Sequence, residues 1–212
     1  ACAPFRRLHL CNKNFPNMNS KDSLKAKNDL LVDVCYAAKY EAESLIPYHD
    51  QYKLTYGDFQ ICTVLARSFA DIGDIVRGRD LYHGKKKRGQ TETERDQLEN
   101  KLKEVFGKIH GGLSTKNGAK EHYGSDAPDF LKLREDWWAL NRDQVWKALT
   151  CDEENKLGGN AYFRATCSDG NSKSQAKDKC RCKDKNGKNT DQVPTYFDYV
   201  PQFLRWFEEW AE

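Results

Sequence analysis

The stretch ARSFADIGDIVRGRDLY, residues 66–82, decides how the rest of the chain must fold. At about 100° per residue, the apolar side chains of this stretch and of the residues just before it share one broad arc of a helix. They are Phe59, Cys62, Leu65, Ala66, Phe69, Ile72, Gly73 and Val76. Asp58 is a suitable N-cap and Gly78 a suitable stop, so the pattern predicts a helix over residues 58–76 with one core-facing side.

The other side of this helix carries two carboxylates three residues apart, Asp71 and Asp74, together with Arg67. Arg67 and Asp71 have i,i+4 spacing, a pair that stabilises a helix by roughly a few tenths of a kcal/mol. A general acid requires burial and a raised pKa, whereas an adjacent cation lowers the pKa of a carboxyl group. We therefore interpret the pair as the ion-paired, solvent-facing side of a structural helix, in preference to an active site or a D-x-x-D metal site.

Four other segments repeat apolar residues at spacings of three and four, which is typical of amphipathic helices. We expect helices over residues 23–45 with Pro47 as the stop, from a capping box at Thr91 and Glu94 to Gly111-Gly112, over 129–149, and from Pro201 onward. The side chains expected in the core include Phe69, Ile72, Trp137, Leu140 and Leu149. No strand-rich region or internal repeat is visible, so the predicted class is all-α.

The composition excludes several functional classes. The 212 residues carry 35 Lys and Arg against 32 Asp and Glu, and this near balance argues against a nucleic-acid binder. No apolar run is long enough to cross a membrane, so we expect no direct membrane insertion. The motifs H-E-x-x-H and G-x-S-x-G and the P-loop do not occur, and we expect no catalysis and no cofactor. Because the chain begins without Met and ends inside an expected helix, we expect it to be an internal piece of a larger protein.

The cysteines indicate an oxidising setting. Eight of them occur, at positions 2, 11, 35, 62, 151, 167, 180 and 182, and none forms a C-x-x-C pair. The spacing therefore does not match a zinc ribbon, while an even number of widely spaced cysteines is typical of disulfides in extracellular proteins.

Four stretches carry a resemblance to a known family: CAPFRRLHLC (2–11), LARSFADIGDIVRGRDLY (65–82), LREDWWALNRDQVWKALTC (133–151) and PTYFDYVPQFLRWFEEWAE (194–212). Together they closely resemble a Duffy-binding-like domain of the alpha type, from the variant erythrocyte membrane proteins of malaria parasites. The resemblance implies an all-α, disulfide-stapled helical bundle with long loops, built as three subdomains.

The same resemblance implies a domain organisation. Residues 1–20 resemble the end of the first subdomain, and residues 21–212 resemble a second, helical subdomain with variable loops at 83–90, 111–127 and 168–192. The third subdomain would be missing from this chain.

The resemblance also implies a pairing of cysteines. It suggests one bridge between Cys62 and Cys167 and another between Cys35 and Cys151, each closing a loop on the order of 100 residues. The partners of the remaining cysteines stay open. These are Cys2, Cys11, Cys180 and Cys182.

In function, the resemblance implies a cell-adhesion module of a variant surface antigen on the extracellular face of the infected host cell, within a larger membrane-anchored protein. The implied partners are red-cell or endothelial receptors, sulfated or blood-group glycans, neighbouring domains of the same chain and host antibodies, but no nucleic acid. The alternative is a non-adhesive antigenic spacer that supports a neighbouring binding domain.

Two basic clusters are the candidate contacts with a sulfated polymer, because such a polymer requires grouped cations. They comprise Arg77, Arg79, Lys85, Lys86, Lys87 and Arg88 in the first cluster, and Lys177, Lys179, Arg181, Lys183, Lys185 and Lys188 in the second. The alternative for both is a solvated loop that charge keeps soluble. Arg6 and Arg7 are expected to form buried or interfacial ion pairs.

Overall fold

The computed structural model describes residues 2–12, 14–15, 18, 22–56, 60–84, 91–116, 118–151, 155–168 and 172–211, with only the backbone of 50 and 52–56. This part of the chain is mostly helical, as the sequence predicts. The elements are α1 Phe5–Leu8, α2 Ala26–Tyr56, α3 Ile61–Arg77, α4 Glu94–Gly111, α5 Ala119–His122, α6 Leu131–Leu149, β1 Cys167–Ser168, β2 Lys173–Ser174, the 3₁₀ turn η2 Phe197–Tyr199, and α7 Gln202–Ala211.

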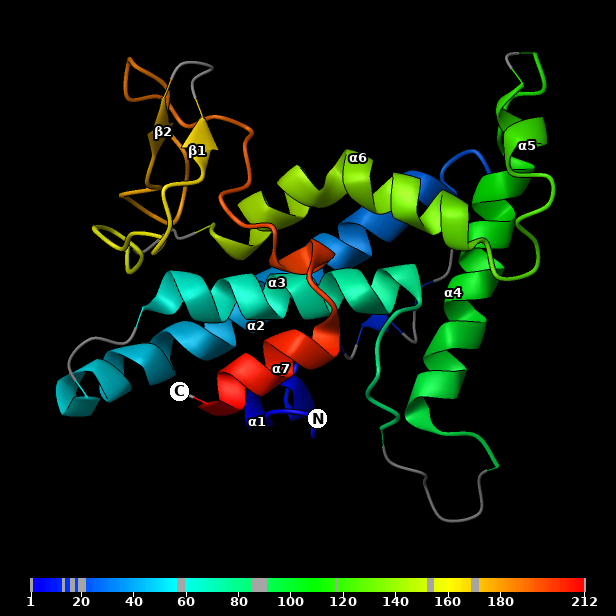
Figure 1. Ribbon diagram of the computed structural model, residues 1–212. Helices are drawn as coiled ribbons and strands as arrows, with labels where there is room; N and C mark the ends of the chain where they lie inside the picture. The colour runs from blue at the N-terminus through cyan, green and yellow to red at the C-terminus, as the bar shows by residue number, and fades with distance from the viewer. Residues whose placement is uncertain are drawn as a thin grey trace.

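Helix α3 is the centre of the fold. It packs against α2, α6, η2, α7 and α1, and Figure 1 shows it running through the middle of the helices. Gly78 ends it in the left-handed conformation, with φ 74°, as expected for a glycine stop. Its first residue is Ile61, and the expected N-cap at Asp58 lies outside the described residues.

Helix α2 continues well past the predicted stop at Pro47. A proline inside a helix removes one hydrogen bond and leaves the carbonyl four residues earlier without its partner. Here that carbonyl belongs to Glu43, and both Glu43 and Pro47 are exposed, so water can satisfy it. The apolar side reaches Ile46, and His49, two residues after the proline, is also buried, so packing of the helix continues past Pro47.

Two helix starts differ from the prediction by two residues each. The capping box of α4 is formed by Thr93 and Asp96, not by Thr91 and Glu94. Helix α6 begins at Leu131, where the carboxylate of Asp126 accepts hydrogen bonds from the first backbone N–H groups, including that of Leu133 at 2.8 Å. In α4 the hydroxyl of Thr93 accepts from the N–H of Asp96 while the carboxylate of Asp96 accepts from the N–H of Thr93, and in α6 the preceding Asp126 reaches forward; a side-chain acceptor at the free N–H groups thus sets each start.

The core lies between α2, α3, α4 and α6. Phe69 contacts the rings of both Trp138 and Trp146, with centroids 5.1 and 5.2 Å apart. The expected core residues Phe69, Ile72, Trp137 and Leu149 are all buried. Leu140 is a correction, because its side chain is 77% exposed. It follows the fully buried Trp138 by two residues, or about 200° around the helix, and therefore points to the opposite side.

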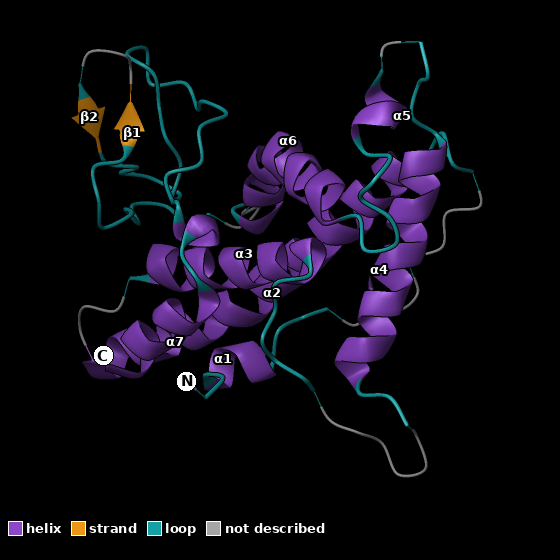
Figure 2. Cartoon of the chain, turned by 45° about the vertical axis from the view of Figure 1, so that its right-hand side comes forward, coloured by secondary structure: helices purple, strands orange, loops and turns teal. Residues whose placement is uncertain are grey.

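The long stretch after α6 forms a separate lobe of loops, which Figure 2 shows at the end of α6 away from α4 and α5. We call residues 155–168 and 172–195 the disulfide-tied lobe. Its regular structure is the antiparallel pair β1 and β2, with Cys167 opposite Ser174. The expected loop at 111–127 instead contains the short helix α5. Within the described residues, no helix is long and apolar enough to cross a membrane.

Candidate adhesion surface

The acidic pair of α3 lies inside the protein. The side chain of Asp71 is 0% exposed and that of Asp74 is 5% exposed. Arg205 of α7 binds both carboxylates, with 2.7 Å between its Nη2 and Asp71 Oδ1, and Arg6 of α1 lies 2.7 Å from Asp71 Oδ2. Arg67, the expected cation on this side, is itself buried. The prediction of a solvent-facing helix side was wrong, because α1 and α7 cover it.

Burial affects the two carboxyl groups differently. It raises the pKa of Asp74 to about 6, and the attraction of Arg205 and Arg77 offsets this only in part. Burial also opposes the ionisation of Asp71, but Arg6 and Arg205 together hold its pKa below the usual value. Because both carboxylates are already bound by guanidinium groups, the arrangement is that of a structural network that joins α1, α3 and α7.

The raised pKa of Asp74 predicts an unusual pH dependence. Because the folded state binds this proton more tightly than the unfolded state does, Asp74 adds stability as pH falls from about 6 to about 4. We expect the free energy of unfolding of the natural chain to rise relative to that of Asp74→Asn over this range, by up to about 3 kcal/mol. Urea titrations of both proteins at pH 4, 5, 6 and 7 measure the difference. A difference that stays constant with pH would contradict the prediction.

Arg77 is a structural residue and not a surface contact. Its side chain is 0% exposed and binds Asp74 at 3.0 Å and the backbone carbonyl of Asp198. The guanidinium group also lies over the ring of Trp138, 5.8 Å from its centroid. Its assignment to the first basic cluster was therefore wrong. Arg79 does reach the surface, where it forms an ion pair of 2.6 Å with Glu135.

The centre of the first basic cluster, Lys85, Lys86, Lys87 and Arg88, lies outside the described residues. Its role in binding therefore stays a prediction. On its described flank, Nδ1 of His83 lies 3.3 Å from Nη1 of Arg95, which places this end of the loop beside the start of α4.

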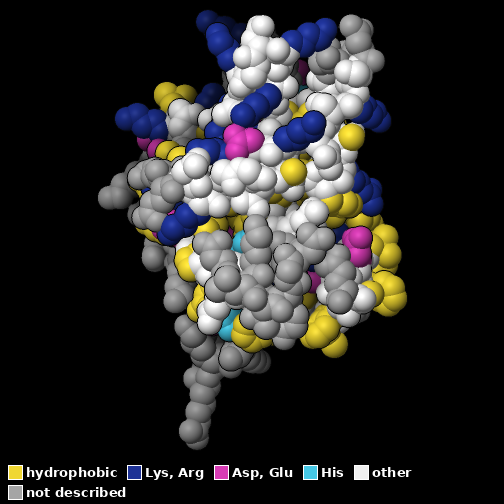
Figure 3. Space-filling view, turned by 90° about the vertical axis from the view of Figure 1, so that its left-hand side faces the viewer, with side chains coloured by type: hydrophobic (Ala, Val, Ile, Leu, Met, Phe, Trp, Pro, Cys, Tyr) yellow, Lys and Arg dark blue, Asp and Glu magenta, His cyan; other side chains and the backbone are white. Residues whose placement is uncertain are grey.

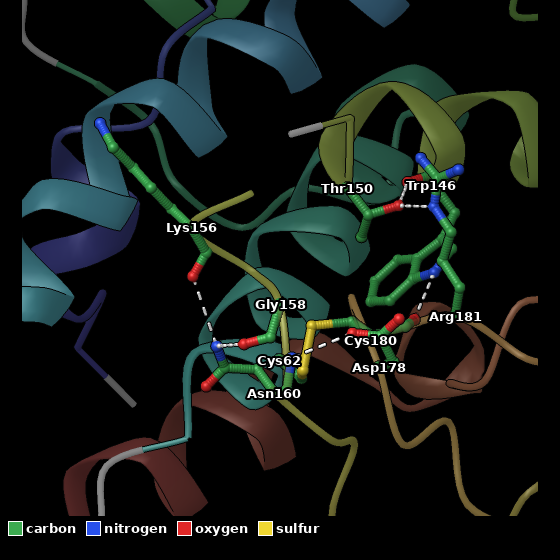
Figure 4. Close-up of a disulfide and its surroundings, with 10 residues drawn as sticks. Cys62, Trp146, Thr150, Lys156, Gly158, Asn160, Asp178, Cys180 and Arg181 are labelled. Carbon is green, nitrogen blue, oxygen red and sulfur yellow. Dashed lines mark hydrogen bonds between the residues drawn. A yellow bond between two sulfur atoms is a disulfide. The ribbon is translucent and has the colours of Figure 1, made fainter. Parts of the chain in front are cut away.

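The disulfides anchor the lobe to the helices in a pairing that differs from the expected one. Cys62 of α3 is bonded to Cys180, 118 residues away, and Cys167 is bonded to Cys182. Figure 4 shows the first of these bonds at the junction of α3 and the lobe, below α6. The expected Cys62–Cys167 bridge was wrong. Both of these cysteines bond to the C-x-C pair, so one short segment is tied to the core and to β1.

The second expected bridge, Cys35–Cys151, is also absent, and both residues are free thiols. Cys35 on α2 is half-buried, and burial, with a smaller contribution from Asp143, raises the pKa of its thiol to about 11. Cys151, just after α6, is exposed.

Arg181 of the second cluster anchors the lobe to α6 and is not a contact on the outer surface of the lobe. Its Nε donates to Thr150 Oγ1 at 2.8 Å and its Nη2 donates to the carbonyl oxygen of Lys147 at 2.8 Å. These groups form the C-terminal end of α6, where carbonyls lack helical partners and a cation is favoured. Figure 4 shows this contact beside the Cys62–Cys180 bond. Arg181 thus joins the disulfides in holding the lobe on the bundle.

The other cations of the second cluster lie at or near the surface. Lys177 and Lys183 are exposed, and Lys183 forms an ion pair of 2.9 Å with Asp178. Lys179 is half-buried, with φ 52°. Lys185 and Lys188 of this cluster are exposed, as is Lys173 outside it. Figure 3 shows Lys and Arg side chains gathered over the upper part of this face, with few acidic side chains among them. The lobe is therefore a rigidly anchored surface with grouped lysines.

Sequence reasoning missed the residue that positions η2. Asp198 is 1% exposed, accepts from Trp138 Nε1 at 2.9 Å and binds Arg142 through both carboxylate oxygens. An acid directly after an aromatic pair, Tyr196-Phe197, carries no recognisable pattern, and its partners Trp138 and Arg142 lie on α6, more than 50 residues earlier in the sequence. Within the described residues, no group of three or more His, Cys, Asp or Glu side chains could hold a metal ion.

Solved structures of known proteins resemble this chain in sequence and in fold. Among solved structures, the NTS-DBL1(alpha-1) domain of Plasmodium falciparum membrane protein 1 from the varO strain is 41% identical, with a TM-score of 0.75. A DBLbeta domain of the same protein family, bound to ICAM-1, is 31% identical with a TM-score of 0.66. These matches cover all of this chain but only 43% and 44% of the solved chains, so the chain spans less than half of their length.

A curated protein that matches is the Duffy receptor beta form of Plasmodium knowlesi, which is 23% identical over an alignment of 217 residues that covers 99% of this chain and 14% of the receptor. A family model described as the Duffy binding domain matches residues 1–205. Since this match extends over nearly the whole sequence and the solved relatives share the fold, the chain belongs to the Duffy binding domain family.

Proposed function

We propose that this chain is a cell-adhesion module of a parasite surface antigen, and that its disulfide-tied lobe binds sulfated glycans of the host cell surface. The observation that carries the proposal is the group of exposed lysines on a lobe that two disulfides and Arg181 hold in place. Similar chains of the same fold that are bound to ICAM-1 support a role in host receptor binding. The proposal includes no catalysis and no cofactor.

The anchoring of the lobe is what makes the lysines effective. A sulfated polymer is held by many weak, salt-sensitive contacts, and cations on a fixed surface lose less conformational entropy on binding than cations on a free loop. Of the three acidic residues in the described part of the lobe, Asp191 pairs with Lys147 of α6 at 2.5 Å, and the other two are engaged within the lobe. Asp178 binds Lys183 and accepts from the N–H of Gly159, and Asp184 accepts from the N–H groups of Asn186 and Lys188. The lysine side chains therefore dominate the outer charge.

The test is binding of the oxidised chain to immobilised heparin across a salt series. We expect the triple variant Lys177→Gln, Lys185→Gln and Lys188→Gln to bind on the order of tenfold more weakly at about 0.15 M salt and to show a shallower salt dependence. The matched control makes the same charge change on α4, at Lys101, Lys103 and Lys108, and should bind normally.

Equal losses in both triple variants would show that net charge alone matters and would refute a site on the lobe. A loss that appears only when Lys85, Lys86, Lys87 and Arg88 are replaced would move the site to the first basic cluster. Desulfated heparin should fail to bind in every case. Binding to neither heparin nor red cells would favour the alternative function, an antigenic spacer that supports a neighbouring domain of the same chain.

We place this module on the extracellular face of the infected host cell, as part of a larger membrane-anchored protein. The disulfides support an oxidising compartment, and the relatives are named as a receptor and a membrane protein of malaria parasites. Host antibodies would meet the same exposed lobe. Nucleic acid is not among the partners we propose, because the charges of the chain are nearly balanced.

A further inference from the structure

A turn at the surface of the disulfide-tied lobe carries the dipeptide Asn186-Gly187, within the lysine-rich segment. The N–H of Asp184 donates to the carbonyl oxygen of Lys188 at 2.8 Å, and the N–H of Gly187 donates to the carbonyl oxygen of Asp184 at 3.0 Å. Gly187 has φ 77°, a left-handed conformation that glycine adopts without strain. The dipeptide therefore forms the tip of a small hairpin.

An asparagine followed by glycine can also modify itself, because a nucleophile and an electrophile are held next to each other in the chain. The backbone nitrogen of Gly187 attacks the side-chain carbonyl carbon of Asn186, and the side-chain amide leaves as ammonia, taking up the proton of the attacking N–H. The product is a cyclic succinimide. Water then opens the ring at either carbonyl and leaves an aspartyl or isoaspartyl residue at position 186. The reaction consumes one water, releases one ammonia and requires no oxidant or cofactor.

Three features of this turn favour the reaction. Asn186 and Gly187 are both exposed, so water reaches the ring and ammonia can leave. Among the described residues, no atom beyond the adjoining chain lies within 4 Å of the point where a Cβ of Gly187 would stand, so the attacking nitrogen is not hindered. Lys185 and Lys188 flank the dipeptide, and their positive charges favour the anionic nitrogen and the oxyanion that form during the attack.

The hydrogen bond from Gly187 to Asp184 opposes the reaction, because it must break before the nitrogen can attack. The carboxylate of Asp184 also holds the turn, since it accepts from the N–H groups of Asn186 and Lys188, each at 2.9 Å. Opening one exposed turn costs far less free energy than unfolding the protein. The turn therefore slows the reaction without preventing it.

The product places a carboxylate among the cations of the second basic cluster. Lys183, Lys185 and Lys188 lie within three residues of position 186, and all are exposed. The existing carboxylate of Asp184 is occupied by backbone N–H groups. A carboxylate at the exposed position 186 instead attracts the neighbouring lysines and repels an approaching sulfate group.

We propose that Asn186 is a site of spontaneous deamidation, and that the carboxylate formed there weakens the binding of the lobe to sulfated glycans. The first part depends only on the turn, whereas the second part rests on the proposed function. A chain that has aged thus adheres less strongly than a newly made one.

The modification is tested by incubating the oxidised chain at mildly alkaline pH and mapping its peptides by mass spectrometry. Asn186 should show the mass change of an amide converted to a carboxyl group, on the order of tenfold faster than Asn189. Asn189 is the internal control, because it is exposed in the same hairpin but precedes Thr190, whose branched side chain hinders the attack. Equal rates at the two positions, or no change at Asn186, would overturn the proposal.

Heparin binding before and after the incubation tests the consequence. The natural chain should lose about threefold in affinity at about 0.15 M salt, since the new carboxylate cancels roughly one cation contact. Asn186→Gln should keep its affinity, because its longer side chain closes the ring less readily. Asn117→Gln removes the other Asn-Gly pair of the sequence, between α4 and α5, and should lose affinity as the natural chain does.

The outcomes separate this proposal from the proposed function. Complete modification of Asn186 with unchanged heparin binding would overturn the second part, and so would an equal loss of affinity in Asn186→Gln and the natural chain. A fresh natural chain that does not bind heparin would refute the proposed function and the effect on binding with it. The mass measurement decides in every case whether Asn186 deamidates.

Discussion

Replacing Asp71 with Ala is expected to lower the free energy of unfolding by about 3–5 kcal/mol, the largest effect of any single change that we predict. The carboxylate is fully buried and binds two guanidinium groups, those of Arg6 and Arg205, from opposite sides. Gln202 also donates to it, at 3.1 Å. Its removal leaves two buried cations with fewer acceptors, and the cost of an uncompensated buried charge far exceeds the worth of an exposed ion pair.

Urea denaturation followed by circular dichroism measures this loss. The matched control is Asp129→Ala, which removes an ion pair with Lys103 whose side chains are 49% and 35% exposed, and it should cost less than about 1 kcal/mol. Asp71→Asn keeps the shape and one acceptor, so it should fall between the two. If Asp71→Ala proves no more destabilising than the control, the network does not hold α1 and α7 on α3.

Removing the Cys62–Cys180 disulfide by changing both residues to Ser is expected to cost about 4–5 kcal/mol. The bond spans 118 residues and therefore restricts the unfolded chain more than the Cys167–Cys182 bond, which spans 15 residues and should be worth about 3 kcal/mol. Denaturant titrations of the two double variants give the order of the effects. Cys151→Ser, at an exposed thiol, is the control and should change stability by less than about 0.5 kcal/mol.

The pairing itself has an independent test. Proteolysis without reduction, followed by mass spectrometry, should recover peptides that join Cys62 to Cys180 and Cys167 to Cys182. A dominant peptide that joins Cys62 to Cys167 would restore the pairing expected from the family resemblance and contradict the structure. Equal losses in the free energy of unfolding of the two double variants would contradict the expectation that the disulfide closing the longer loop stabilises the protein more.

The local signals in the sequence were sufficient for most of the helices. The apolar repeat of α3 and the glycine stop at Gly78 lie within a single element, so these local residues specify the helix and its end without distant contacts. Propensity was less reliable at Pro47, where a local rule predicts a stop. The helix continues there because packing on both sides of the proline, at Ile46 and at His49, outweighs one lost hydrogen bond at a solvent-exposed position.

The candidate surface was only partly predictable, for the same reason. Lys177 and Lys183 are surface cations, as a charged loop suggests, but Arg77 and Arg181 are part of the interior and of a helix end. A run of basic residues does not distinguish these cases. Arg77 also donates to the carbonyl of Asp198 and Arg181 to that of Lys147, and these partners from other segments are not visible in the local sequence.

The sequence by itself determined the all-α class, the main helices, their apolar sides and the family. These depend on periodicity, on caps and on long motifs, which are local properties of the chain. The tertiary structure alone decided that Asp71 is buried and that Cys62 is bonded to Cys180. Each of these depends on which distant segments meet, because burial, ion pairing and disulfide geometry belong to pairs of segments and not to either one alone.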